Sequence, residues 1–185
     1  RYPGSNAGVI SAHTDFEVFS LIHQKTKGLQ FEIHANANGD GDGDGRGEAQ
    51  WMWAPVTADD DTFLIIPGDM LEFWTNGAVK ALKHRVVNCG EERHSLVLFF
   101  AANEDEDAAP AGKHAVKVGD PAEWCSAYAS ARSKAGVSPG CKLTQGIHLQ
   151  HRIAEAEANW ARLRSKGKQG IASNANQHQS SHPIE

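Results

Sequence analysis

The chain has 185 residues, a formal net charge of -5 and a hydrophobic content of 40%. This length suits one domain with its own core, and the composition is ordinary for a globular protein. The sequence lacks the basic patch or stripe that nucleic-acid binding needs, and no apolar run approaches the roughly 20 residues that cross a bilayer. We therefore expect neither a nucleic-acid nor a membrane partner.

Three cysteines, Cys89, Cys125 and Cys141, are widely spaced along the chain. They form no Cys-x-x-Cys pair, which argues against a zinc knuckle or a redox motif. An odd number of cysteines fits a reducing compartment with free thiols. We expect a cytoplasmic location.

The first hundred residues contain many short segments of strand character separated by turn signals. Leu29, Phe31 and Ile33 alternate with polar neighbours, which is typical of a half-buried strand. Asn76-Gly77 predicts a hairpin turn after a strand over 70–74. Short strands at close spacing favour a mainly β sandwich or barrel over a parallel α/β sheet. The predicted strands are 16–24, 29–33, 51–55, 62–66, 70–74, 84–88 and 95–101.

Residues 36–47 form a Gly/Asp-rich insertion between two of these strands, and we expect it to be a mobile loop. Its Asp40-x-Asp42-x-Asp44 run resembles the start of an EF-hand calcium loop. That loop needs a glutamate at its twelfth position and flanking helices, whereas the twelfth residue here is Trp51 and the flanks read as strands. We therefore expect no calcium site. Trp51 and Trp53 alternate on a strand and are predicted to lie in the core.

The composition shifts at Glu104, and the chain beyond is rich in alanine and polar residues. Residues 149–164 predict an amphipathic helix, with apolar residues along one stripe. From Lys166 onward the polar sequence predicts disorder. We therefore expect a β core over 1–103, an extension with the helix over 104–165, and a tail over 166–185.

Five residues carry most of the chemical information. His13 and Asp15 are spaced His-x-Asp, so on extended backbone they share a face, and His84 follows much later. Two imidazoles and one carboxylate bind one side of a metal and leave the other side open, which suits Fe(II) and oxygen chemistry. Arg93 and Ser95 are also two residues apart. The charged guanidinium of Arg93 and the hydroxyl of Ser95 suit the binding of a dicarboxylate. Each metal-bound imidazole would also need an acceptor for its other nitrogen.

Four segments in this order resemble the iron(II)- and 2-oxoglutarate-dependent dioxygenases. The most similar branch includes isopenicillin N synthase and many small-molecule hydroxylases. The resemblance runs from about Tyr2 to Ala102, and it implies the family's double-stranded β-helix, or jelly roll. The segments are Ser11-Ala12-His13-Thr14-Asp15-Phe16, Lys27-Gly28-Leu29-Gln30, Ile66-Pro67-Gly68-Asp69-Met70-Leu71-Glu72-Phe73-Trp74-Thr75-Asn76-Gly77, and His84-Arg85-Val86-Val87-Asn88 through Arg93-His94-Ser95.

The resemblance implies that the His-Asp-His set ligates Fe(II). It implies that Arg93 forms a salt bridge with the distal carboxylate of 2-oxoglutarate and that Ser95 hydrogen-bonds to it. Tyr2, which precedes a proline as a family tyrosine does, would contact the same co-substrate. The implied reaction consumes O2 and 2-oxoglutarate, gives succinate and CO2, and hydroxylates, desaturates or cyclises a small organic substrate. Phe16 and Phe100 are candidates for lining the substrate pocket.

Only 12 residues precede His13, whereas family members carry a longer N-terminal region. We therefore expect a fragment of a longer protein or a reduced core, with a sheet edge and apolar surface exposed. Two alternatives stay open. One is an iron oxidase of the same fold that uses no keto acid, in which Arg93 and Ser95 hold a substrate carboxylate. The other is an inactive core that serves as a binding module. The oligomeric state is open.

Overall fold

The computed structural model describes residues 10–35, 48–56, 62–114 and 121–178. Tyr2 and the Gly/Asp-rich insertion lie outside the described residues. The chain divides into two compact units, Arg1–His148 and Leu149–Glu185. The first unit carries all the described strands.

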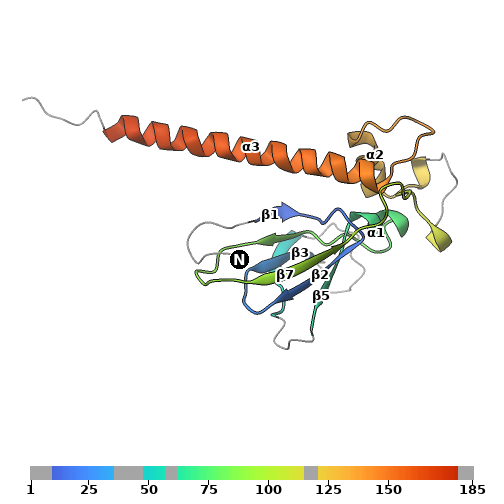
Figure 1. Ribbon diagram of the computed structural model, residues 1–185, viewed down its shortest axis with the longest axis horizontal. Helices are drawn as coiled ribbons and strands as arrows, with labels where there is room; N and C mark the ends of the chain where they lie inside the picture. The colour runs from blue at the N-terminus through green and yellow to red at the C-terminus, as the bar shows by residue number, and fades with distance from the viewer. Residues whose placement is uncertain (1–9, 36–47, 57–61, 115–120, 179–185) are drawn as a thin grey trace, which may run out of the picture. The chain divides into compact units, whose positions relative to one another are not determined.

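The first unit contains two antiparallel sheets (Figure 1). The first has the order β1-β6-β3-β4, and the second has the order β5-β2-β7. The predicted mainly β fold is confirmed. The strands are β1 (Ile10–His13), β2 (Phe19–Gln24), β3 (Leu29–Ala35), β4 (Glu48–Trp53), β5 (Leu64–Pro67), β6 (His84–Val86) and β7 (Ser95–Phe100).

The two sheets enclose an apolar core. Ile22 and Ile66 from the second sheet are buried against Leu29 and Val86 from the first. Each such side chain contributes roughly 1.5–3 kcal/mol when fully buried. Alternate residues of β2 are buried, so Ser20, Ile22 and Gln24 share the face that looks toward the other sheet.

The predicted strand over 70–74 is wrong, because this segment is helix α1 (Asp69–Trp74). Its apolar run is too short for periodicity alone to separate strand from helix. Asn76-Gly77 is not a hairpin turn but the end of this helix. Asn76 has a φ of 50° and Gly77 a φ of 81°, and the Gly77 amide donates to the Glu72 carbonyl at 2.8 Å. A left-handed residue with such a reaching-back bond is a common helix C-terminus.

Residues beyond 103 contribute half of the buried members of a second apolar cluster in the same unit. They contribute helix α2 (Ser126–Lys134) and the short 3-10 turns Gly112–His114 and Pro121–Glu123. Tyr128 of α2 lies 5.7 Å from Phe73 of α1, ring centre to ring centre. This part of the chain therefore packs with α1. The buried members of the cluster are Val18, Met70, Phe73, Ala108, Tyr128 and Leu143.

Helix α3 runs from Gln145 to His178 and is longer than the predicted 149–164. Residues 166–178, predicted to be disordered, continue it, and no proline interrupts the helix before its end. The remainder of the predicted tail, 179–185, lies outside the described residues. Within the described chain, no helix is both long and apolar enough to cross a membrane.

Candidate metal centre and carboxylate anchor

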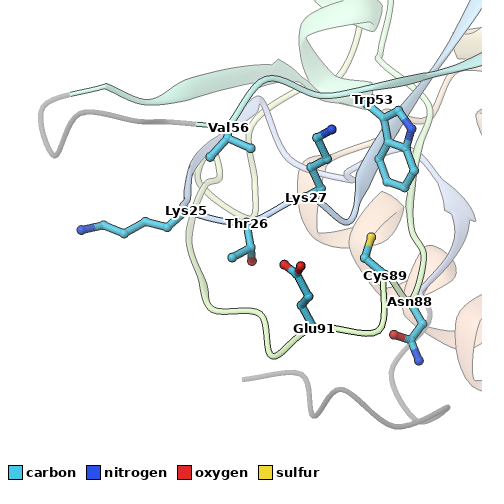
Figure 2. Close-up of a pocket in the computed structure, with 8 residues that line it drawn as sticks. All are labelled: Lys25, Thr26, Lys27, Trp53, Val56, Asn88, Cys89 and Glu91. Atoms are coloured by element: carbon cyan, nitrogen blue, oxygen red, sulfur yellow. The ribbon is translucent and has the colours of Figure 1, made fainter.

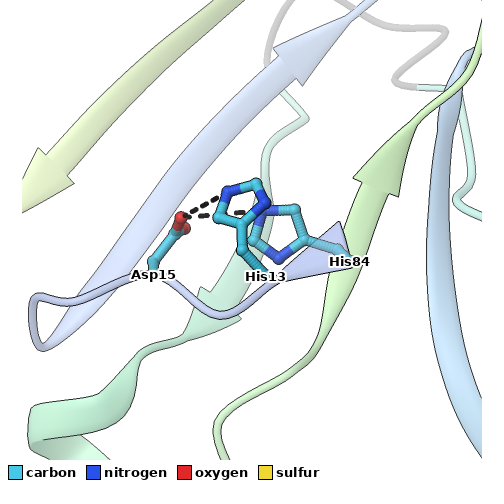
Figure 3. Close-up of side chains that lie close together, drawn as sticks. All are labelled: His13, Asp15 and His84. Atoms are coloured by element: carbon cyan, nitrogen blue, oxygen red, sulfur yellow. Dashed lines mark ion pairs between the residues drawn. The ribbon is translucent and has the colours of Figure 1, made fainter. Parts of the chain in front are cut away.

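His13, Asp15 and His84 converge at one end of the sandwich (Figure 3). Asp15 Oδ1 lies 3.7 Å from His13 Nε2 and 3.6 Å from His84 Nε2. One potential ligand atom from each residue lies within 4.8 Å of the others. Asp15 and His84 are buried, and His13 is partly exposed. Three donors this close together can share one cation.

Strand pairing brings the two histidines together although they are far apart in sequence. His13 ends β1, His84 begins β6, and the two are direct partners in the antiparallel register. Their rings lie 4.4 Å apart, centre to centre. Asp15 follows β1 by two residues, in the turn that leads to β2. The spacing in the sequence and the pairing of the strands therefore both contribute to the site.

Each histidine ring is held through its Nδ1. His13 Nδ1 contacts the Ser11 carbonyl at 2.8 Å, and His84 Nδ1 contacts the Leu82 carbonyl at 2.9 Å. A carbonyl only accepts, so Nδ1 carries the proton and Nε2 keeps its lone pair. The Ser20 hydroxyl donates to Asp15 Oδ2, which orients that carboxylate. These partners could not be identified from the sequence. They are of the kind that orients metal ligands, and the donor set therefore fits a divalent metal.

Burial also favours neutral imidazole at this site. It lowers the pKa of His84, an effect that the bond to Leu82 and the charge of Asp15 partly oppose. A lowered pKa keeps the ring deprotonated at Nε2 near neutral pH, which metal binding requires. Burial raises the pKa of nearby Glu17, and the charge of Asp15 adds to that increase.

Arg93 is buried inside the sandwich, with 4% of its surface exposed. Its Nη2 donates to Gln24 Oε1 at 2.9 Å, and Gln24 Nε2 donates to the Pro55 carbonyl at 2.9 Å. Gly28 makes room for this side chain, because a Cβ there would lie 2.6 Å from Arg93 Cδ. Gln24 is not among the predicted site residues, since its only signal is a polar side chain two positions after Ile22 on a buried strand face.

Both candidate subsites lie along the inner face of β2. Ser20 contacts the metal-site carboxylate, and Gln24 contacts Arg93. Ser95 is the direct partner of Gln24 in the β2–β7 register, so it shares that face. At about 3.3 Å per residue, the Cα atoms of Ser20 and Gln24 are roughly 13 Å apart along the strand, and the side chains of the two subsites extend into the space between the sheets. The structure therefore places Arg93 and Ser95 on the metal-site side of the sheet.

Apolar side chains flank the metal site on the same inner faces. Phe31 is the direct partner of His84, and Met52 is the direct partner of Phe31. Phe99 is the direct partner of Ser20, whereas Phe100 stacks on Phe19 on the opposite face, 4.7 Å away. Phe99, rather than the expected Phe100, therefore looks toward the site.

A separate cavity of about 630 Å³ lies at the other ends of β2 and β6 (Figure 2). Both strands begin near the triad and lead away from it to the loops that line this cavity. Trp53 lies at its wall and is half exposed, and Trp51 lies under the Arg85 guanidinium at 4.0 Å. The prediction that both tryptophans are core residues is wrong, because they lie on the face of β4 opposite Met52. The cavity is lined by Lys25, Thr26, Lys27, Trp53, Val56, Asn88, Cys89 and Glu91.

The chain belongs to the 2OG-Fe(II) oxygenase superfamily, whose family model matches residues 2–102, more than half of the chain. It is 31% identical to the 2-oxoglutarate-dependent dioxygenase tropC of Talaromyces stipitatus, over 51% of this chain and 25% of that protein. It is 35% identical to gibberellin 2-beta-dioxygenase 3 of Arabidopsis thaliana, over 53% of this chain and 25% of that protein. The chain thus spans about a quarter of the length of these relatives.

Solved structures share the fold. A full-length Neurospora crassa protein, solved in complex with alpha-KG and thymine, matches with a TM-score of 0.52 and 21% identity, over 80% of this chain and 37% of that one. The dioxygenase for auxin oxidation in rice matches with a TM-score of 0.52 and 18% identity, over 84% of this chain and 44% of that one. The predicted jelly-roll core is confirmed.

Proposed function

We propose that this chain carries the catalytic centre of an Fe(II)- and 2-oxoglutarate-dependent dioxygenase that oxidises a small organic molecule. The observation that carries the proposal is the His13, Asp15 and His84 cluster, with both imidazole Nε2 atoms within 3.7 Å of one carboxylate oxygen. Family membership supports the identity of the metal and the co-substrate. When bound, Fe(II) supplies the O2 chemistry that couples 2-oxoglutarate decarboxylation to substrate oxidation.

The protein's own residues would bind and orient the reactants. Arg93, held by Gln24, would form a charge-assisted bond with the distal carboxylate of 2-oxoglutarate, and the Ser95 hydroxyl would donate to the same group. Burial of Arg93 would strengthen this contact, because water competes less for the charge. Tyr2 stays a predicted contact of the co-substrate.

The apolar residues beside the triad favour a substrate with an apolar group at the position to be oxidised. Phe31, Met52 and Phe99 are the side chains that would meet it. Aromatic and apolar walls bury substrate surface and keep water away from the reacting bond. The relatives' names point to small organic molecules as the class, and the particular substrate and a cytoplasmic location stay predictions.

Anaerobic titration of the chain with Fe(II) and then 2-oxoglutarate tests the proposal. We expect iron to bind and a visible charge-transfer band to grow as the keto acid chelates the metal. Iron binding without the band would favour the keto-acid-independent oxidase, with Arg93 and Ser95 holding a substrate carboxylate. Absence of iron binding would favour the alternative in which the chain is an inactive core that serves as a binding module.

A further inference from the structure

The turn that carries Asp15 is held by its backbone carbonyls. Three carbonyls of residues 15–18 accept hydrogen bonds from successive amides at the start of α1, and the fourth accepts one from Gln145 Nε2 at 3.4 Å. Gln145 is buried and begins α3. The bonds from α1 are Gly68 to Val18 at 2.9 Å, Asp69 to Asp15 at 2.9 Å and Met70 to Glu17 at 3.2 Å.

Close packing between this turn and α1 leaves no room at Gly68. A Cβ there would lie 2.2 Å from the Glu17 carbonyl oxygen and 3.1 Å from that of Asp15. The start of α1 therefore constrains the backbone conformation of the Asp15 turn. Contacts that hold α1 in place also help to hold the Asp15 carboxylate in place.

His148 holds the start of α1 in turn. Its Nε2 lies 3.0 Å from Asp69 Oδ2, and both side chains are buried. The carboxylate accepts, so His148 Nε2 donates. The His148 and Phe73 rings also form a T-shaped contact, with 5.0 Å between the ring centres. Asp69 is thus bound to Asp15 through its amide and to His148 through its side chain.

Gln145 and His148 are three residues apart in the first turn of α3, so they lie on one face of that helix. The turn is fixed to the preceding segment, because the Gln145 amide donates to the Glu106 carbonyl at 2.9 Å and the Gly146 amide to the Glu104 carbonyl at 2.8 Å. All of these residues lie beyond the segment, 2–102, that the family model matches.

We propose that Gln145 and His148 are positioning residues for the metal ligand Asp15. They fix the turn of residues 15–18, directly through the Phe16 carbonyl and indirectly through Asp69, so that the carboxylate meets the two histidines. The segment 103–148 is then part of the catalytic unit. This inference rests on the proposed metal site and extends it to residues that the family match does not include.

Iron affinity and stability, measured separately, test the inference. We expect His148→Leu to raise the Fe(II) dissociation constant by about ten- to a hundredfold, a typical effect of losing a group that orients a metal ligand. His148→Gln should restore most of the affinity, because its amide can donate from the Nε2 position. Gln145→Met, which keeps the volume, should raise the constant about threefold. Equilibrium dialysis of the 185-residue chain under nitrogen measures these constants.

Tyr128→Ala is the matched control. It removes a buried ring from the same apolar cluster, but on α2, and should lower the free energy of unfolding in urea without changing iron affinity. If it weakens iron binding as much as His148→Leu does, the role of His148 is merely structural and the inference fails. Unchanged affinity in both His148→Leu and Gln145→Met also overturns it. Failure of the unaltered chain to bind Fe(II) would instead refute the proposed function, and the inference with it.

Discussion

The face of the β5-β2-β7 sheet that looks into the sandwich carries Ser20, Gln24 and Ser95, whereas the opposite face carries Leu96 and Leu98. The outer leucines are 68% and 59% exposed, while Ser20 and Gln24 are fully buried. A half-buried antiparallel sheet ordinarily carries apolar residues inside and polar residues outside, whereas here buried polar residues share the inner face with the core residues Ile22 and Ile66.

The inner polar residues have partners that explain their burial. Ser20 holds a metal-site carboxylate, and Gln24 holds Arg93. Buried polar groups are tolerated when they are hydrogen-bonded, so these residues are compatible with the proposed site beside the apolar core. The outer apolar residues agree with the expected exposed surface, and contiguous patches of this kind promote association. The difference between the two faces indicates that the proposed site accounts for the polar residues on the inner face, and that it places no such requirement on the outer face.

The largest expected effect is the loss of the metal site. His84→Ala removes a buried member of the proposed triad from the inner side of β6 and should abolish succinate formation. His94→Ala is the control, because His94 is exposed and its ring contacts Glu92, away from the triad. A coupled assay for succinate measures both variants. Turnover retained in His84→Ala would disprove the proposed triad.

The next effect concerns the carboxylate anchor. Arg93→Ala should raise the 2-oxoglutarate concentration needed for half-maximal rate by about a hundredfold, since hydrogen bonds to charged groups contribute roughly 1.5–3 kcal/mol. Arg85→Ala removes an arginine from the outer face of β6, where it bonds Gln30 and stacks on Trp51, and should leave that requirement unchanged. An equal shift in both variants would contradict a specific anchor at Arg93.

A smaller effect should follow from crowding Arg93. Gly28 has a φ of 151°, and a Cβ added at this position would overlap the Arg93 side chain. Gly28→Ala should therefore displace the guanidinium and raise the 2-oxoglutarate requirement about tenfold. Gly90 also has a positive φ, but a Cβ added there would have no other atom within 4 Å, so Gly90→Ala is the matched control. It should lower the melting temperature without changing the co-substrate requirement. Equal behaviour of the two variants would show that backbone strain alone is responsible.

The smallest effect should come from the outer face. Leu98→Lys should change the free energy of unfolding by less than about 0.5 kcal/mol and reduce self-association. Val97→Lys, one residue away on the inner face, should destabilise the chain more than Leu98→Lys does, because partly buried Val97 packs against the apolar core. Urea unfolding and light scattering compare the pair. Greater self-association in Leu98→Lys would mean that the outer face is not the surface that aggregates.

Much of the fold could be predicted from the sequence, because alternation and turn residues are local signals. Six of the seven predicted strands overlap strands of the structure. The seventh, 70–74, lies in helix α1. A run of five residues rich in apolar side chains fits both the helical and the strand period, and the tertiary packing of Met70 and Phe73 decides between them. Gln24, Gly28 and His148 could not be assigned roles, because each acts through a residue distant in the sequence.

The sequence by itself determined which donors this protein has and which of them share a face. The two-residue period of extended backbone predicts that His13 shares a face with Asp15, and Arg93 with Ser95, although Asp15 itself lies in the turn after β1. Only the tertiary structure decided which face looks inward, because a period of two is the same on both sides of a sheet. The registers of β6 against β1 and of β7 against β2 bring His84 to His13, set Ser95 beside Gln24 and turn Phe99 inward in place of Phe100.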